Sequence, residues 1–372
     1  MKVLVLVTGG RGGSDFFQGL LDGHKEILQI PGILRINKEF KNLFKNNDSN
    51  LIAEKFIKFV PLIFDSRKNI LERHNKLGKN KNEYYKVDKK KFINHYKKLS
   101  QSNLVKNNSS KINILENLYK AYYLASKRPI KNLKAILIHT HTVEYTEKLF
   151  KFENIKNCTI IHTMRHPINA ICSPIFNWLK FKRGMNFFPK DLYFQLDLAI
   201  MGLKRLCKMN REVKVILLEN LINKKEMVMK DFCKIYKLKY SKSMLKSTYF
   251  GKQWWGDQIS GRWIGKKVHN VENRQNLMLR KVFYQKDLYY FSTITKKISE
   301  IYFKENELNF FKNKVYYNLT PLKAEILVWK NTFKHKKIKH ILSIPYFYIK
   351  RIMLLNKLFI NNYKLPYSIG VK

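Results

Sequence analysis

The segment that decides the fold class is Lys2-Val3-Leu4-Val5-Leu6-Val7-Thr8, followed directly by Gly9-Gly10-Arg11-Gly12-Gly13-Ser14. Its first part is a continuous apolar run of the length of one strand, and a helical pattern begins at Ser14. The glycines between them predict a tight loop. A strand, a glycine-rich loop and a helix in this order indicate the first unit of an α/β fold.

Three further apolar runs have the length of strands, and each precedes a stretch that can be helical. They are residues 135–138, 158–162 and 213–218. Strands that alternate with helices predict a parallel sheet with helices on both faces, which is a three-layer α/β architecture.

The organisation of the chain follows from the segments between these runs. Residues 38–128 are polar and rich in Lys and Asn, with helical periodicity over 50–60, 91–99 and 112–125, which predicts a helical insertion. We expect one catalytic domain over residues 1–304. Residues 305–372 are basic and aromatic and are expected to form a C-terminal extension, whose role the sequence does not indicate.

Composition excludes several classes of protein. The chain has 372 residues, of which 45% are hydrophobic, so it is too apolar for a disordered tail and long enough for a full-size core. Its four cysteines are far apart, without a Cys-x-x-Cys pair, which argues against a zinc ribbon or a redox motif and favours a reducing compartment. We find no signal peptide and no spanning segment, and therefore expect a cytoplasmic protein.

The net charge of +46 has two explanations. Only 13 of the 73 basic residues are Arg, and the Lys residues are spread among Asn, Ile, Phe and Tyr, which favours a compositional bias and a solvated lysine surface. Attraction to polyanions or a peripheral contact with anionic membranes is the alternative. Because Arg is scarce, the positions of the arginines become informative.

The loop from Thr8 to Ser14 is suited to bind an anion. Its unpaired backbone N–H groups and the positive end of the following helix favour phosphate or sulfate. The loop is not a Walker A motif, because no Lys precedes Ser14 and Arg11 lies in its middle. This departure weakens the case for ordinary ATP binding, and a turn without a ligand stays the alternative.

A second basic segment follows the run at 158–162. Pro167 suits the first turn of a helix, which places Arg165 at the end of the strand and Ser173 about two turns into the helix. An Arg side chain can bind phosphate through two parallel hydrogen bonds, and a Ser hydroxyl can donate to the same group.

Together, these segments resemble the sulfotransferases that use 3′-phosphoadenosine 5′-phosphosulfate (PAPS). The first signature of that family is a basic residue, a small residue, Gly and Ser or Thr, which matches residues 11–14. The second is an Arg with a Pro two residues later and a Ser eight residues later, which matches Arg165, Pro167 and Ser173. His166 stands where the family usually has Asn or Asp.

Two weaker matches follow in the order of the family. Leu218-Glu219-Asn220-Leu221 looks like its strand-Glu-Asp-Leu element, and Ser260-Gly261-Arg262-Trp263 looks like its Gly-Arg-Trp segment. The resemblance covers about residues 1–300. It implies a sulfotransferase fold related to the P-loop NTPases, and transfer of a sulfuryl group from PAPS to a hydroxyl, or an amine, of a carbohydrate or small metabolite, without a metal.

The resemblance also implies residue roles. Arg11 and the backbone of Gly12, Gly13 and Ser14 are expected to hold the 5′-phosphosulfate. Arg165 and Ser173 are expected to hold the 3′-phosphate, Thr248 to lie near the adenine, and Arg262 to complete the donor site. Arg11 is also expected to stabilise the negative charge that builds on the leaving phosphate oxygen.

The acceptor hydroxyl needs a base, for which His141 is the first candidate. The ordinary pKa of a His side chain, near 6.5, suits proton removal at neutral pH. His139 points to the same side of the strand, but His141 lies nearer the carboxyl end, where ligands bind to such sheets. Glu144 is a further candidate.

Two other functions stay open. A phosphoryl-transfer kinase on a similar sheet would need magnesium and an acidic ligand, for which Asp257 and Glu219 are the candidates. A non-catalytic protein that binds polyanions or nucleic acid would use the basic surface and its aromatic residues, although we expect no specific nucleic-acid partner. The acceptor and the oligomeric state are not indicated by the sequence.

Overall fold

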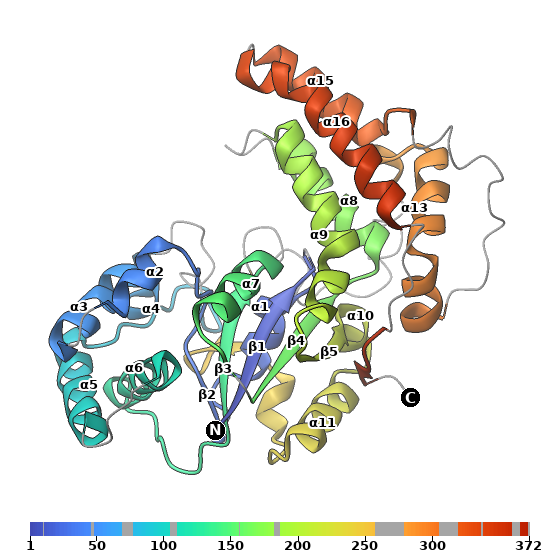
Figure 1. Cartoon of the computed structure of the whole chain (residues 1–372). Coiled ribbons are helices and arrows are strands. Elements are labelled where there is room, and N and C mark those ends of the chain that lie inside the picture. The colour runs from blue at the N-terminus through green and yellow to red at the C-terminus, as the bar shows by residue number, and fades with distance from the viewer. Residues whose placement is uncertain are drawn as a thin grey trace.

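The structure is a computed structural model of the chain (Figure 1). It describes residues 1–9, 11–45, 48–68, 77–104, 110–155, 157–181, 187–256, 279–304, 319–335, 338–358 and 365–370. Among these residues, no helix is both long enough and apolar enough to cross a lipid bilayer.

Six parallel strands form the central sheet. They are β1 (Lys2–Thr8), β2 (Ile27–Gln29), β3 (Ala135–His141), β4 (Cys158–Met164), β5 (Glu212–Leu217) and β8 (Ser368–Ile369), in the spatial order β2-β3-β1-β4-β5-β8. β1 lies between β3 and β4, and its apolar side chains are buried on both faces of the sheet. The predicted α/β class, with a parallel sheet between layers of helices, is confirmed.

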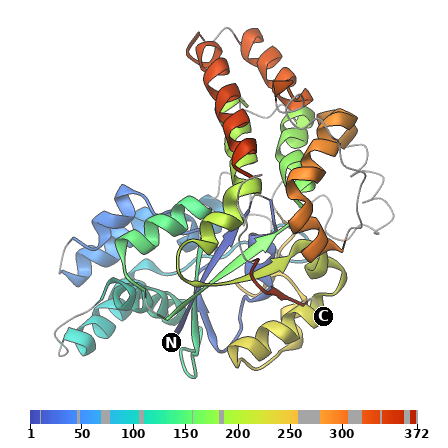
Figure 2. The same cartoon turned by 45° about the vertical axis from the view of Figure 1, so that its right-hand side comes forward.

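Helices cover both faces of this sheet (Figures 1 and 2). On one face, α1 (Ser14–Leu20) and α11 (Lys225–Tyr236) share a core with Leu4 and Leu6 of β1. On the other face, α7 (Val143–Phe152) and α9 (Pro189–Cys207) pack around Val7. Successive side chains of β1 therefore point to opposite faces of the sheet: Leu4 and Leu6 pack on one face, and Val7 packs on the other.

In the described part of the segment predicted as a helical insertion, five helices and one short 3₁₀ turn are present. They are α2 (Lys38–Leu43), α3 (Ser49–Phe59), α4 (Pro61–Phe64), η1 (Ser66–Lys68), α5 (Lys89–Leu104) and α6 (Lys111–Ala125). Phe56, Phe64 and Phe92 pack against one another in the core of this group, and the same core includes Val3 and Val5 of β1. The insertion therefore completes the cover of the sheet.

A helical arm rises from the carboxyl edge of the sheet (Figures 1 and 2). It contains α8 (Pro167–Phe181), α13 (Gln285–Ile298), α15 (Lys323–Lys334) and α16 (Ile338–Leu358), which share a core with α9. After the arm, the chain returns to the sheet, where Ser368 of β8 pairs with Val215 of β5. The described part of residues 305–372, expected as an extension, is thus packed into the arm and the sheet.

Short elements connect these parts. They are α10 (Leu218–Asn223), η2 (Lys242–Leu245), β6 (Thr248–Tyr249), β7 (Lys252–Gln253) and the π-helical turn η3 (Ser299–Phe303). The hairpin of β6 and β7 lies against α1, and it approaches so closely that a Cβ at Gly19 would lie 2.2 Å from Oγ of Ser247. A glycine at this position lets the hairpin pack on α1.

His162 of β4 makes the stability of the fold dependent on pH. Burial lowers the pKa of its imidazole from 6.5 to about 4, so the folded state keeps the ring neutral. The unfolded chain binds a proton near pH 6.5, so stability falls as the pH falls from 6.5 towards 4. At pH 4.5, we expect this group to have removed about 2.5 kcal/mol of the stability present at pH 7.

Urea unfolding of wild type and His162→Phe at the two pH values measures this contribution. Phe cannot take up a proton, so the variant should lose about 2.5 kcal/mol less than wild type on acidification. His335→Gln, at an exposed histidine, should keep the wild-type pH dependence. An equal loss in wild type and His162→Phe would contradict the assignment.

Candidate functional site

The glycine-rich loop after β1 is packed tightly against the end of β4. At Gly12, a Cβ would lie 2.4 Å from the carbonyl oxygen of Thr163, so a larger residue does not fit. Oγ1 of Thr8 donates to this carbonyl at 3.2 Å and accepts the N–H of Gly12 at 3.0 Å. Gly13 has φ of 86°, a conformation that glycine adopts without strain. These contacts fix the loop at the carboxyl edge of the sheet.

Not all of the backbone N–H groups that the sequence predicts as anion donors are available to an anion. The N–H of Gly12 is bonded to Thr8, so Gly12 supplies the close turn and its N–H serves the loop itself. Gly13 and Ser14 begin α1, where backbone N–H groups have no carbonyl one turn earlier in the helix. The N–H groups of Gly13 and Ser14 are therefore the ones suited to an anion.

Arg11 and Arg165 approach each other at this edge. Arg165 directly follows β4, the neighbour of β1. Burial lowers the pKa of its guanidinium, Glu219 raises it, and the positive charge of Arg11 lowers it further. Two guanidinium groups close enough to repel each other favour an anion between or beside them.

Glu219 is held next to Arg165 by the backbone. Its Oε1 accepts the N–H of His166 at 3.1 Å, from the first turn of α10. The ring of His166 lies 4.9 Å from that of Phe303, and its Nε2 is 3.4 Å from Oγ of Ser299. The side chain that replaces the usual Asn or Asp of the resemblance therefore packs against η3, while the negative charge of Glu219 acts on Arg165.

Ser173 lies on α8, next to Cys172. The side chain of Ser173 is buried, and the charge of Arg165 acts on its neighbour Cys172. Burial raises the pKa of the Cys172 thiol to about 12, and the guanidinium opposes this shift. The charge of Arg165 therefore reaches the residue next to Ser173.

β3 carries His139 and His141 to the same edge, with their rings 5.6 Å apart. Leu6 of β1 pairs with His139 whereas Val7 pairs with His141, so β3 contains one extra residue, and His141 has φ of 68°. Such bulges change the direction of a side chain. Here Nδ1 of His141 lies 3.3 Å from Oγ of Ser14, so the half-buried ring lies beside the start of α1, where the glycine-rich loop ends.

Gln18 is a site residue that the sequence analysis missed. Its Oε1 lies 3.0 Å from Nδ1 of the buried His139 and accepts the N–H of Gly32 at 3.2 Å, while its Nε2 donates to the carbonyl of Ile30 at 2.8 Å. It ties His139 to the segment after β2. The sequence did contain an indication of this role: Gln18 follows Ser14 by four residues, which places the two side chains on one face of α1.

Asp15 adds a carboxylate to this group, with Oδ1 3.9 Å from Nδ1 of His139. One ligand atom from each of Asp15, His139 and His141 lies within 4.8 Å of the others. Two imidazoles and a carboxylate at this spacing can hold a transition-metal ion. The sequence analysis expected no metal, and the same side chains can equally form a hydrogen-bonded group around the base.

Other predicted residues lie elsewhere. Oγ1 of Thr248 donates to Asp22 at 3.0 Å, and Asp22 forms an ion pair with Arg128. The Thr248 hydroxyl therefore lies near the C-terminal end of α1, away from the glycine-rich loop at its N-terminal end. Glu144 is exposed on α7 and pairs with Lys148. Arg262, like Asp257, lies outside the described residues.

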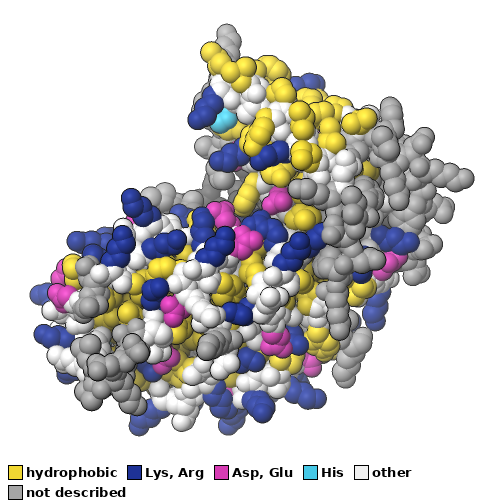
Figure 3. All heavy atoms as spheres, viewed as in Figure 1, with side chains coloured by type: hydrophobic (Ala, Val, Ile, Leu, Met, Phe, Trp, Pro, Cys, Tyr) yellow, Lys and Arg dark blue, Asp and Glu magenta, His cyan; other side chains and the backbone are white. Residues whose placement is uncertain are grey.

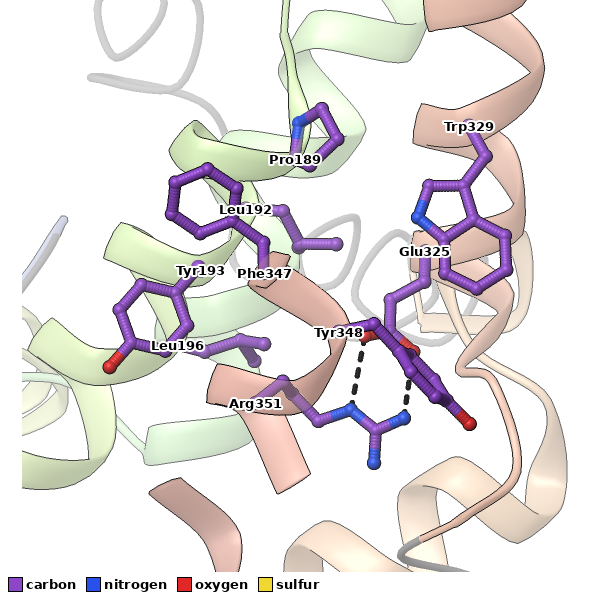
Figure 4. Close-up of a pocket in the computed structure, with 9 residues that line it drawn as sticks. All are labelled: Pro189, Leu192, Tyr193, Leu196, Glu325, Trp329, Phe347, Tyr348 and Arg351. Carbon is purple, nitrogen blue, oxygen red and sulfur yellow. Dashed lines mark hydrogen bonds and ion pairs between the residues drawn. The ribbon is translucent and has the colours of Figure 1, made fainter. Parts of the chain in front are cut away.

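A separate pocket lies within the arm, between α9, α15 and α16 (Figure 4). It is lined by Pro189, Leu192, Tyr193, Leu196, Glu325, Trp329, Phe347, Tyr348 and Arg351. The cation of this lining, Arg351, is bonded to Glu325. The positive charge of this pocket is therefore neutralised by Glu325. At the carboxyl edge of the sheet, in contrast, Arg11 and Arg165 bring two positive charges near each other.

Comparison with known proteins finds similarity at the level of structure. The sequence matches no protein-family model and no curated protein. Among solved structures, the chain is similar to a sulfotransferase domain from the curacin biosynthetic pathway, with a TM-score of 0.35 and 14% sequence identity, over 70% of this chain and 81% of that domain. A similarity this low carries no argument about activity, and the assignment of function depends on the residues at the carboxyl edge.

Proposed function

We propose that this chain transfers a sulfuryl group from PAPS to a hydroxyl, or less readily an amine, of a carbohydrate or small metabolite. The observation that supports this proposal is the approach of Arg11 and Arg165 beside the glycine-rich loop. Two cations at the ends of adjacent strands suit a donor that carries two separate anionic groups. The sequence signatures around the same residues favour PAPS as that donor.

In this proposal, the two ends of the donor bind to different segments. Arg11 and the N–H groups of Gly13 and Ser14 hold the 5′-phosphosulfate, and Gly12 lets the loop turn close to it. Arg165 and the hydroxyl of Ser173 hold the 3′-phosphate. The negative charge of Glu219, which is held by the N–H of His166, favours the charged form of Arg165.

His141 acts as the base. In the tautomer whose Nδ1–H donates to Ser14, the lone pair of the ring lies on Nε2. The acceptor oxygen attacks sulfur, the bond from sulfur to the 5′-phosphate oxygen breaks, and the acceptor proton passes to Nε2. Arg11 stabilises the charge left on that phosphate oxygen. His139 is buried and Glu144 faces solvent, so both are less well placed than His141.

The kinase alternative has less support. Of its two candidate magnesium ligands, Asp257 lies outside the described residues, and Glu219 accepts the N–H of His166 and is near the charge of Arg165. If Glu219 bound magnesium, the metal ion and the nearby guanidinium of Arg165 would repel each other.

Calorimetric titration with adenosine 3′,5′-bisphosphate, ADP and AMP, at two salt concentrations, tests the proposal. We expect micromolar binding of the bisphosphate and about tenfold or weaker binding of the other two, because each lacks the group that Arg165 and Ser173 would hold. Equal, weak and salt-sensitive binding of all three nucleotides would contradict it. That result would favour a protein that binds polyanions through its general charge.

A further inference from the structure

The outward face of α16 is apolar from Ile338 to Met353. Ile338 and Leu342 are each 73% exposed, and Tyr346, Ile349 and Met353 are between 53% and 56% exposed. Their spacing of four, four, three and four residues places them on one side of the helix. A helix at the surface of a globular protein normally turns its polar side outward. In α16 the exposed side is apolar, while the buried side contains the charged Arg351 together with Leu354 and Leu355.

Positive charge borders this apolar face. Lys339 is exposed beside Ile338, and Lys350 lies at the flank, with Nζ 4.6 Å from the ring centroid of Tyr346. At the end of α15, the exposed Phe333 is followed by the exposed Lys334. The sequence contains no Asp or Glu between residues 326 and 372. Figure 3 shows hydrophobic side chains gathered over the arm with Lys and Arg among them.

We propose that this face of α16 docks onto an anionic lipid membrane. Helices that lie in a membrane interface bury an apolar side among the lipid chains and place lysines at the headgroups. Each Lys close to an anionic surface adds to the attraction. Tyr346 fits the same boundary, because its ring is apolar and its hydroxyl is polar.

Charge also decides between a membrane and a second copy of this chain. A copy would bring the same acid-free, lysine-bordered face and the same net charge of +46, so the two faces would repel each other. An anionic membrane offers both an apolar layer and the opposite charge. The proposal does not depend on sulfuryl transfer, because no residue of the proposed donor site lies on α16.

Flotation of the full-length protein with lipid vesicles tests this docking. Wild type should float with vesicles of equal parts phosphatidylcholine and phosphatidylglycerol, and remain at the bottom with phosphatidylcholine alone. The triple variant Ile338→Gln/Leu342→Gln/Ile349→Gln should bind the anionic vesicles about tenfold more weakly, since it removes apolar surface that the lipid would bury. Lys339→Gln/Lys350→Gln should weaken binding and reduce its dependence on salt.

Matched controls distinguish an effect of this face on vesicle binding from an effect of general charge or of misfolding. Leu51→Gln/Ile222→Gln, at exposed apolar residues of α3 and α10, should float like wild type. The altered residues are exposed apart from Lys350, which is half-buried, so thermal unfolding of each variant should stay close to that of wild type. No flotation of wild type, or equal flotation of the triple variant and wild type, would overturn the proposal. It would equally be overturned if wild type self-associated in sedimentation and the triple variant did not.

Discussion

Replacing Arg165 with Ala should weaken the binding of adenosine 3′,5′-bisphosphate about 100-fold and change the binding of AMP by less than about twofold. The reason is that a guanidinium at the end of β4 would contact only the 3′-phosphate, while Arg11 and the loop after β1 would contact the 5′ side. Parallel calorimetric titrations of wild type and variant with the two nucleotides give this ratio directly.

Two further variants make the experiment decisive. Arg165→Lys should keep part of the affinity, because Lys supplies charge without the two-pronged geometry of a guanidinium. Arg67→Ala removes a half-exposed arginine that pairs with Asp65 in the insertion, and should leave both affinities unchanged. Equal losses for AMP and the bisphosphate in Arg165→Ala would show that Arg165 does not distinguish the 3′-phosphate.

The loss of Arg165 also leaves Glu219 beside the site without its cation. Arg165→Ala/Glu219→Gln removes the remaining negative charge, so any loss of affinity that persists in it comes from the missing guanidinium. A double variant that recovered bisphosphate binding would show instead that the carboxylate of Glu219 had repelled the ligand, and the assignment of the 3′-phosphate to Arg165 would fail.

Four of the six strands could be predicted from the sequence because β1, β3, β4 and β5 are each buried runs of six or seven residues. β2 has three residues and β8 has two. Such short segments carry no periodic signal of their own, and they become strands because β3 and β5 present free edges to them. Strand order is likewise set by packing between distant segments.

The helical arm shows a different limit of the sequence analysis. α16 has 21 residues, but apolar side chains lie on both its buried and its outward sides, and Pro345 stands in the middle. Periodicity of apolar residues indicates a helix only where one side is polar. The helical pattern of α16 could not be recognised in the sequence because its outward face is apolar. This is the face that we propose docks onto a membrane.

Within the site, the residues at strand ends were predictable and the contacts between them were not. Parallel strands direct their carboxyl ends to one edge, so Ser14, His141 and Arg165 were expected near one another. The bulge at the end of β3 depends on the register between β3 and β1, which a single sequence does not reveal. The contact of Gln18 with His139, and the position of Thr248 at the far end of α1, depend on the same kind of long-range packing.

The largest effect on stability should come from breaking the ion pair of Arg351 and Glu325 inside the arm (Figure 4). Nε and Nη2 of Arg351 each donate to one oxygen of Glu325 at 3.0 Å, and Oε2 also accepts the N–H of Leu322 at 2.9 Å. The two side chains are 1% and 5% exposed. Burial raises the pKa of Glu325, and the neighbouring guanidinium opposes that shift.

Arg351→Met should therefore reduce the free energy of unfolding by about 3–5 kcal/mol, because it leaves a carboxylate buried without its counter-charge. Urea unfolding followed by tryptophan fluorescence measures the loss, since Trp329 lines the pocket beside the pair. Lys230→Met, which breaks the exposed pair of Lys230 and Glu226 on α11, is the matched control and should leave the stability close to that of wild type.

The double variant Arg351→Met/Glu325→Leu decides what the pair contributes. If the cost of the single variant comes from the isolated carboxylate, removing both charges should return the stability to within about 1 kcal/mol of wild type, or above it, because apolar side chains of similar size need no desolvation of charge. A double variant as unstable as Arg351→Met would show that the geometry of the pair itself holds α15 against α16. A loss in the single variant no larger than that of Lys230→Met would show that water reaches the pair, and the arm would then owe its stability to its apolar contacts alone.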